Sequence, residues 1–167
     1  MIILELEDFD YWADNQVTGK DGVLVFSPMF VFLIDWAYKF NKIDESLLKE
    51  PEFNNAYLAL SKNKIKFSEF VLDILDEKLL DTYFTEEARQ FICDYIEYDG
   101  YMNDLSSTFK CAMWELPHEL INTNILYDKI NRSLANYIKN KSNYPDLCVF
   151  TDPEELKRQQ DLDKKSH

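Results

Sequence analysis

The most apolar stretch of the chain is Gly22–Phe40, and its pattern predicts a helix at the centre of the core. Ser27 followed by Pro28 is typical of a helix start. Serine at the N-cap accepts a hydrogen bond from an unpaired backbone N–H, and proline at the first helical position loses no hydrogen bond that the helix would make. We therefore expect the helix to begin at this pair, with a short strand over residues 23–26 before it.

Apolar residues recur at three- and four-residue spacing along the predicted helix, which is the pattern of a helix packed against a core. The stripe consists of Met29, Leu33, Trp36 and Phe40. Other aromatic and aliphatic residues flank it so broadly that little more than Asp35 and Lys39 is left for water. The helix should therefore be buried on most sides.

Capping residues predict three more helices between residues 44 and 79. Asp44 is placed to cap a short helix that ends near Leu48, and Pro51 is placed to start the next. Ser68 is the expected cap of the third. The apolar residues of that helix are Phe70 or Val71, Ile74, Leu75 and Leu79.

The second half of the chain predicts helices of the same kind. Thr85 precedes two glutamates, and acidic residues in a first turn favour the positive end of the helix dipole. Gly100 is expected to end this helix, because glycine readily adopts the left-handed conformation. A weaker helical pattern covers residues 104–114, and a final helix covers 124–140. The inward positions of the final helix are Leu126, Ile130, Leu134, Tyr137 and Ile138.

The two ends of the chain differ from this pattern. Ile2–Leu6 alternates weakly and predicts a short edge strand, while Phe9–Ala13 fits the start of a helix equally well. Residues 151–167 are almost entirely polar or charged and predict a mobile tail. We expect a mainly α fold, with residues 1–150 forming one helical bundle of six to eight helices and a small N-terminal β element.

Composition limits the partners of such a domain. The 167 residues include 31 acidic and 18 basic side chains, which give a net charge of −13. This charge repels phosphate backbones and anionic lipid surfaces, so neither nucleic acid nor a membrane is an expected partner. A basic protein, in contrast, would be attracted to the surface and steered onto it.

The cysteines and the N-terminus both indicate a cytoplasmic protein. Cys93, Cys111 and Cys148 are widely spaced and odd in number, which fits neither a disulfide framework nor a zinc site. We expect them to be reduced thiols. The N-terminal residues lack the basic region and continuous apolar core of a secretory signal.

The sequence offers little material for catalysis. His118 is the one internal histidine, and a pair between it and Cys93 or Cys111 is less favoured than buried thiols at apolar helical positions. The sequence also lacks a glycine-rich phosphate loop and a nucleophile elbow. We therefore predict no enzyme, no catalytic residue and no cofactor.

Clusters of carboxylates could in principle hold a metal ion. Two such sets are Asp73, Asp76 and Glu77, and Asp94, Glu97 and Asp104. In so acidic a chain, however, helical clusters of Asp and Glu usually form solvated faces, so we predict no metal site.

Acidic residues stand beside tyrosines near the end of the helix that follows Thr85. Exposed acids can pair with Lys or Arg while neighbouring rings supply contact area, although each ring could instead close the core. The predicted partner-binding patch consists of Asp94, Glu97, Tyr98, Asp99, Tyr101 and Asp104. The acidic faces 73–77 and 5–14 are rival docking surfaces.

Three segments together resemble small bacterial immunity proteins that are paired with polymorphic or contact-delivered toxins. They are Ser27–Ala37, Phe84–Phe91 and Tyr98–Asp104, so the resemblance covers residues 27–104 through aromatic core positions and a helix start. It implies a cytoplasmic, acidic, mostly helical inhibitor that binds its cognate toxin and blocks the active site or substrate access. The alternatives are a secretion chaperone or adaptor, and a small carboxylate-dependent enzyme.

Overall fold

The structure is a computed structural model that describes residues 1–9 and 22–140. Seven α-helices lie within this part of the chain, in agreement with the predicted six to eight. They are α2 (Gly22–Lys39), α3 (Glu45–Leu48), α4 (Pro51–Ser61), α5 (Phe67–Asp73), α6 (Glu86–Glu97), α7 (Gly100–Phe109) and α8 (Thr123–Lys139). Three short 3-10 helices are η1 (Leu6–Phe9), η3 (Asp81–Tyr83) and η4 (Met113–Glu115).

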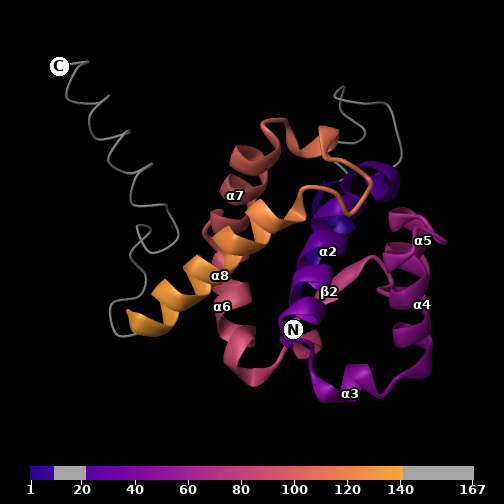
Figure 1. Cartoon of the computed structure of the whole chain (residues 1–167), viewed down its shortest axis with the longest axis horizontal. Coiled ribbons are helices and arrows are strands. Elements are labelled where there is room, and N and C mark those ends of the chain that lie inside the picture. The colour runs from indigo at the N-terminus through magenta and orange to yellow at the C-terminus, as the bar shows by residue number, and fades with distance from the viewer. Residues whose placement is uncertain (10–21, 141–167) are drawn as a thin grey trace.

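The helix α2 stands at the centre, as its apolar pattern predicts. Figure 1 shows α4 and α5 on one side of it and α6, α7 and α8 on the other. The rings and aliphatic chains of α2 are almost all buried, and Trp36 is fully buried with its Nε1 donating to Asn131 Oδ1 of α8 at 2.9 Å. The core is thus arranged around one helix that contacts both layers.

The start of α2 corrects two predictions. The helix begins at Gly22, so residues 23–26 are helical and do not form a strand. Ser27 is therefore inside the helix rather than at its N-cap, and Pro28 has no N–H to donate to the carbonyl of Leu24. The residues on both sides of this pair are apolar and buried, and this packing outweighs the local cost of an interior proline.

The end of α2 differs from the prediction at two positions. Asp35, expected to face water, is completely buried, while Lys39 is 46% exposed as expected. Phe40 lies beyond the last helical residue and is 40% exposed, so it is not part of the buried stripe.

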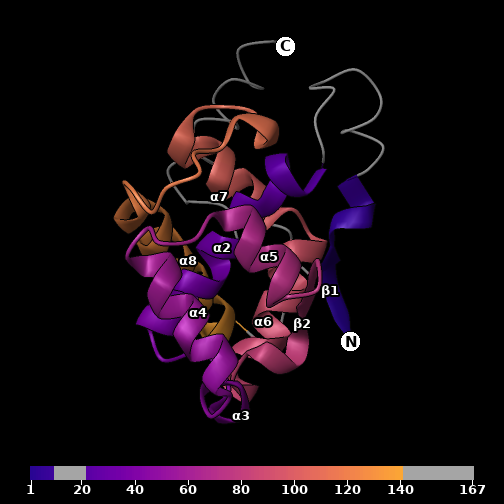
Figure 2. The ribbon, with the colours of Figure 1, turned by 90° about the vertical axis from the view of Figure 1, so that its right-hand side faces the viewer.

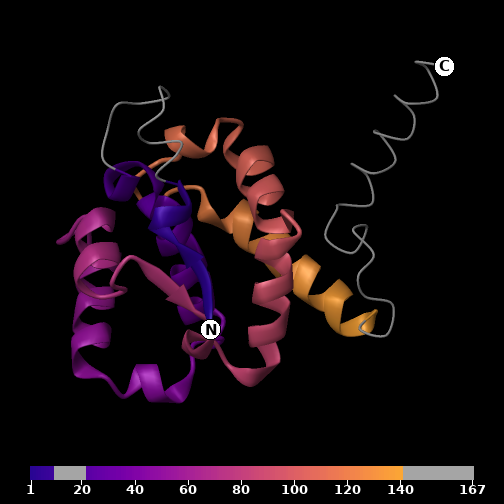
Figure 3. The ribbon, with the colours of Figure 1, turned by 180° about the vertical axis from the view of Figure 1, so that it is seen from behind.

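The predicted N-terminal strand is confirmed as β1 (Ile2–Glu5), which pairs antiparallel with β2 (Lys78–Leu80). The register shifts between Ile2 and Leu4. Figure 3 shows this two-stranded ribbon on the face of α2 that is hidden in Figure 1. The N-terminal ammonium of Met1 donates to Asp81 Oδ1 at 2.6 Å and holds the start of the chain to the residue after β2.

The helix pair α4–α5 matches the predicted starts in part. Asp44 caps α3 and Pro51 begins α4, as predicted. The cap of α5 is Lys66 rather than Ser68, because Glu69 Oε2 accepts from the Lys66 backbone N–H at 2.5 Å. Leu79 belongs to β2 and not to this helix. Figure 2 shows α4 rising from α3 and the chain crossing to α5 beside it.

The second layer begins after Thr85, as predicted, and its turns differ in detail. Between α6 and α7, the left-handed residue is Asp99, with φ of 61°, and Gly100 begins α7. Aspartate tolerates this conformation better than most residues do, so glycine was not required there. The helix predicted at 104–114 is α7 followed by η4, with Lys110 in a left-handed conformation between them.

The last described helix, α8, confirms the predicted span of 124–140 to within one residue at each end. Leu126, Ile130, Leu134 and Tyr137 are buried, whereas Ile138, predicted to face inward, is 49% exposed. The alternative helix at Phe9–Ala13 falls mainly, and the predicted tail at 151–167 entirely, outside the described residues. No helix in the described part of the chain is long and apolar enough to cross a membrane.

Candidate functional site

A fully buried carboxylate joins three helices beside the centre of the core. Asp35 of α2 accepts a hydrogen bond from Tyr57 Oη of α4 at 2.8 Å and another from Tyr127 Oη of α8. Lys39 Nζ lies 2.7 Å from Asp35 Oδ2 and 5.4 Å from the centroid of the Tyr127 ring. Burial, followed by the nearby charge of Asp35, raises the pKa of both tyrosines, so their hydroxyls remain protonated donors. The cluster satisfies a buried charge, and both carboxylate oxygens of Asp35 are engaged within the protein.

Two aspartates of the predicted partner-binding patch are buried and hydrogen-bonded to tyrosines, as Asp35 is. Asp94 of α6 accepts from Tyr137 Oη of α8 at 2.7 Å and from Gln90 Nε2 at 3.1 Å. Asp104 of α7 accepts from Tyr95 Oη of α6. These pairs hold α6, α7 and α8 together.

The six residues predicted to form the partner-binding patch are therefore not all available at the surface. Asp94, Asp104 and Tyr101 are buried, and Tyr101 Oη donates to the Met29 carbonyl of α2 at 2.6 Å. The prediction that they project together with their neighbours is wrong, because each points inward to a hydrogen-bond partner. The remaining residues are the exposed Glu97 and Asp99 and the half-buried Tyr98.

The candidate nucleophiles are in poor environments for catalysis. Cys93 is buried on α6 and Cys111 is half-buried, and burial raises the pKa of both thiols, which favours the unreactive protonated form. His118 is exposed, and its ring centroid lies 6.1 Å from that of Phe67. Cys148 lies outside the described residues.

The two carboxylate sets considered as metal sites do not converge. Among the side chains that the structure describes, no three of His, Cys, Asp or Glu are arranged to hold a metal ion. In the first set Asp73 is exposed at the end of α5, and in the second Asp94 is engaged with Tyr137.

A surface groove of about 150 Å³ lies where α4 begins and α5 ends. Its apolar and aromatic lining residues come from α3, α4, the two residues that follow α5, and η3: Leu47, Phe53, Ile74, Leu75 and Tyr83. Its acidic residues are the exposed Glu50, Glu52 and Asp73. Burial, followed by the nearby charge of Asp76, raises the pKa of the half-buried Tyr83, so its hydroxyl stays neutral. An apolar groove with an acidic edge is suited to a ligand that carries both an apolar part and a positive charge.

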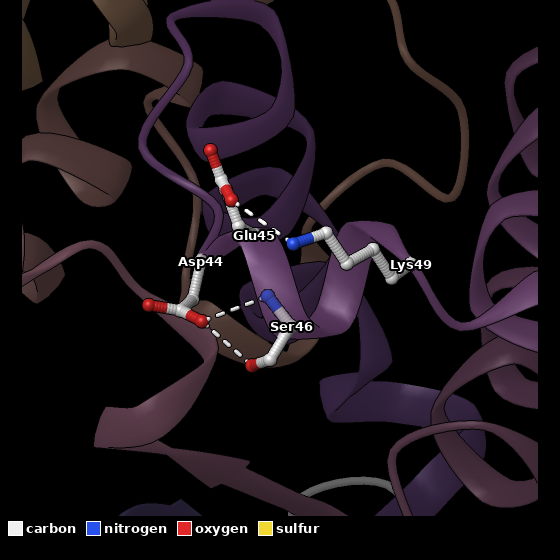
Figure 4. Close-up of polar contacts among 4 residues, drawn as sticks. All are labelled: Asp44, Glu45, Ser46 and Lys49. Carbon is white, nitrogen blue, oxygen red and sulfur yellow. Dashed lines mark hydrogen bonds and ion pairs between the residues drawn. The ribbon is translucent and has the colours of Figure 1, made fainter.

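The three acids of the groove differ in their contacts from Asp44 and Glu45, which precede them in the chain. Figure 4 shows that Asp44 Oδ1 accepts from the backbone N–H of Ser46 at 2.9 Å and from its hydroxyl, and that Glu45 Oε2 lies 3.1 Å from Lys49 Nζ. These hydrogen bonds lower the pKa of Asp44. Glu50, Glu52 and Asp73 have no ion pair with any cation of the described residues.

A larger hollow of about 660 Å³ lies at the opposite end of the α4–α5 pair. Its charged lining is mixed, since Lys64, Lys66 and His118 stand with Glu69 and Glu119. The α4–α5 pair therefore has an acidic end and a lysine-bearing end.

Only part of the groove could be anticipated. Asp73 lies on one of the rival acidic faces, 73–77, and Pro51 marks the helix start that places Glu50 and Glu52 at the same end of α4. The sequence contains no signal that α5 returns to the start of α4, so Asp73 could not be joined to the two glutamates. The other rival face, 5–14, extends beyond the described residues.

The chain belongs to the family described as a domain of unknown function (DUF7832), whose model matches residues 27–119. The matched segment contains every residue of the groove, from Leu47 to Tyr83, and excludes β1 and α8. Comparison with curated proteins and with solved structures gave no match.

Proposed function

We propose that this chain is a non-enzymatic bacterial immunity protein that acts in the cytoplasm by binding and neutralising a basic toxin or effector. The observation that carries the proposal is the groove, where three exposed carboxylates without a described cationic partner stand beside apolar side chains. Asp35 and Asp94, in contrast, are held inside the protein by tyrosine hydroxyls and are not open to a partner.

The charge of the whole chain supports the same proposal. A net charge of −13 attracts a basic protein at long range and raises the rate of encounter at low salt. The raised pKa of the Cys93 and Cys111 thiols and the hydrogen bonds of the interior aspartates favour binding over catalysis as the role of the domain. The resemblance of residues 27–104 to immunity proteins points in the same direction.

The test is co-expression with the protein encoded by the adjacent reading frame. We expect the chain to rescue growth from the toxicity of that protein and to form a complex whose affinity falls as salt rises. Binding that leaves the toxic domain active would contradict inhibition and indicate an adaptor or secretion chaperone. Binding that is indifferent to salt would contradict electrostatic docking.

A further inference from the structure

We infer that the groove between the start of α4 and the end of α5 is the docking point for an arginine or lysine side chain of the basic partner protein. The inference rests on the proposed function, and it names the surface of this chain and the chemistry of the group that fits it. The groove is small, about 150 Å³, which suits one side chain rather than a folded element.

Charge is the first argument for this occupant. Glu50 and Glu52 at the start of α4 and Asp73 at the end of α5 supply three carboxylates from two helices, all exposed. One turn earlier in the chain Glu45 already has a lysine partner, Lys49, at 3.1 Å. No cationic side chain of the described residues pairs with these three acids, and the positive end of the α4 dipole offsets the charge of Glu50 and Glu52 only in part.

The apolar lining is the second argument. Arginine and lysine bury their aliphatic stems against apolar surface while the charged head reaches polar groups. Phe53 and Leu75 line the groove and are almost fully buried, and the lining also includes the half-buried aromatic residue Tyr83, a residue type that can contact a cation. A surface that carried only carboxylates would attract cations but would not provide apolar contacts for the aliphatic stem.

The opposite end of the same helix pair would orient the partner. Lys62, Lys64 and Lys66 follow α4 closely and stand with Glu69 and Glu119, so this end is mixed in charge and attracts a basic surface less than the acidic end does. Glu97 and Asp99, the exposed acids of the predicted patch, line neither of the two hollows described above. Among these surfaces, only the acidic end of α4–α5 combines attraction with a cavity.

The test uses the full chain, labelled with ¹⁵N, and the blocked peptide Ac-Ala-Arg-Leu-Ala-NH₂ as the probe. We expect shifts of the backbone amides of Phe53, Leu75 and Tyr83 on titration and no comparable shift at Tyr98. The peptide with Glu in place of Arg should leave all four amides unchanged. Shifts that are as large around Tyr98 as in the groove would overturn the inference.

Two matched variants separate the groove from general charge. Glu50→Gln/Asp73→Asn and Glu97→Gln/Asp99→Asn each remove one glutamate and one aspartate charge, and Asn keeps the left-handed conformation of residue 99 accessible. We expect the first pair to weaken binding of the arginine peptide by about fivefold and the second by less than about twofold. Equal effects of the two variants would contradict the inference.

The same variants distinguish this inference from the proposed function. If the Glu50→Gln/Asp73→Asn variant still neutralises the neighbouring toxin with unchanged affinity, the inference about the groove is wrong and the proposed function stands. If the groove binds the arginine peptide but the chain fails to neutralise that toxin, the function is wrong and the groove stands as a cation-binding surface.

Discussion

At the scale of single residues, tyrosine hydroxyls and aspartates account for much of the polar interior. Asp35, Asp94 and Asp104 each accept a hydrogen bond from a tyrosine on another helix. A buried carboxylate without such partners would be strongly destabilising, because the charge is removed from water with nothing to replace the solvent. These pairs therefore select which helices can lie side by side.

The Asp35 cluster provides a test at this scale. We expect Asp35→Ala to lower the free energy of unfolding by about 3–5 kcal/mol, since it leaves two tyrosine hydroxyls buried without an acceptor. Tyr127→Phe should cost only about 1–2 kcal/mol, because Asp35 keeps Tyr57 and Lys39 as partners. Urea unfolding followed by circular dichroism measures both. A loss below about 1 kcal/mol for Asp35→Ala would show that the carboxylate is not held in the core.

At the scale of elements, the helices differ in how much of their surface is buried, and α8 buries one narrow stripe where α2 is buried on most sides. Its hydrogen-bonding residue Tyr137 and its apolar residue Ile130 face the core, while Ile138 one residue after Tyr137 faces solvent. Successive residues of an α-helix are rotated by about 100° about its axis, so Tyr137 and Ile138 point in different directions although both side chains are large.

Two identical substitutions on α8 test this orientation. Ile130→Ala should cost about 2–5 kcal/mol because it leaves a cavity in a fully buried site. Ile138→Ala should change stability by less than about 0.5 kcal/mol because the side chain is already half exposed. Thermal unfolding of the two variants beside the parent chain gives the comparison, and similar losses for both would contradict the described face of the helix.

At the scale of the whole molecule, the acidic charge is divided between the interior and the surface. The interior aspartates are matched by tyrosines, while surface acids such as those of the groove remain available to a partner. Net charge alone therefore overstates how many acids a partner can reach, because some serve the fold.

The tyrosine network predicts a limit of stability at high pH. Burial raises the pKa of the network tyrosines above the ordinary value of 10.0 in the folded state: Tyr57, Tyr95, Tyr101, Tyr127 and Tyr137. The unfolded chain releases these protons at a lower pH than the folded chain does. The free energy of unfolding is therefore intact below about pH 10 and falls as the pH rises beyond it. Each tyrosine that ionises only on unfolding steepens the loss by about 1.4 kcal/mol per pH unit.

The measurement is a pH titration in which tyrosinate absorbance and circular dichroism are recorded together. We expect the buried tyrosines to ionise in the same step in which the helical signal is lost. Ionisation of all tyrosines near pH 10 in a chain that stays folded would contradict their burial. The variant Tyr137→Phe should reduce the number of tyrosinates released in that step.

The sequence by itself determined the fold class, most helix spans and the central place of α2. These features follow from the period of apolar residues and from capping residues such as Asp44 and Pro51, which act over one or two turns. The N-terminal strand was predicted for the same reason, since alternation is a local pattern. Ser27-Pro28 was misleading because a local start signal was outweighed by burial of the whole helix.

Only the tertiary structure decided which polar residues face inward and which surfaces meet. Asp35 and Asp94 have the same sequence character as exposed acids, and their burial depends on tyrosines 92 and 43 residues away. The groove likewise depends on the return of α5 to the start of α4, which brings Asp73 into the same groove as Glu50. Such contacts join distant parts of the chain, so no local pattern of residues contains them, and they exist only once the helices have packed.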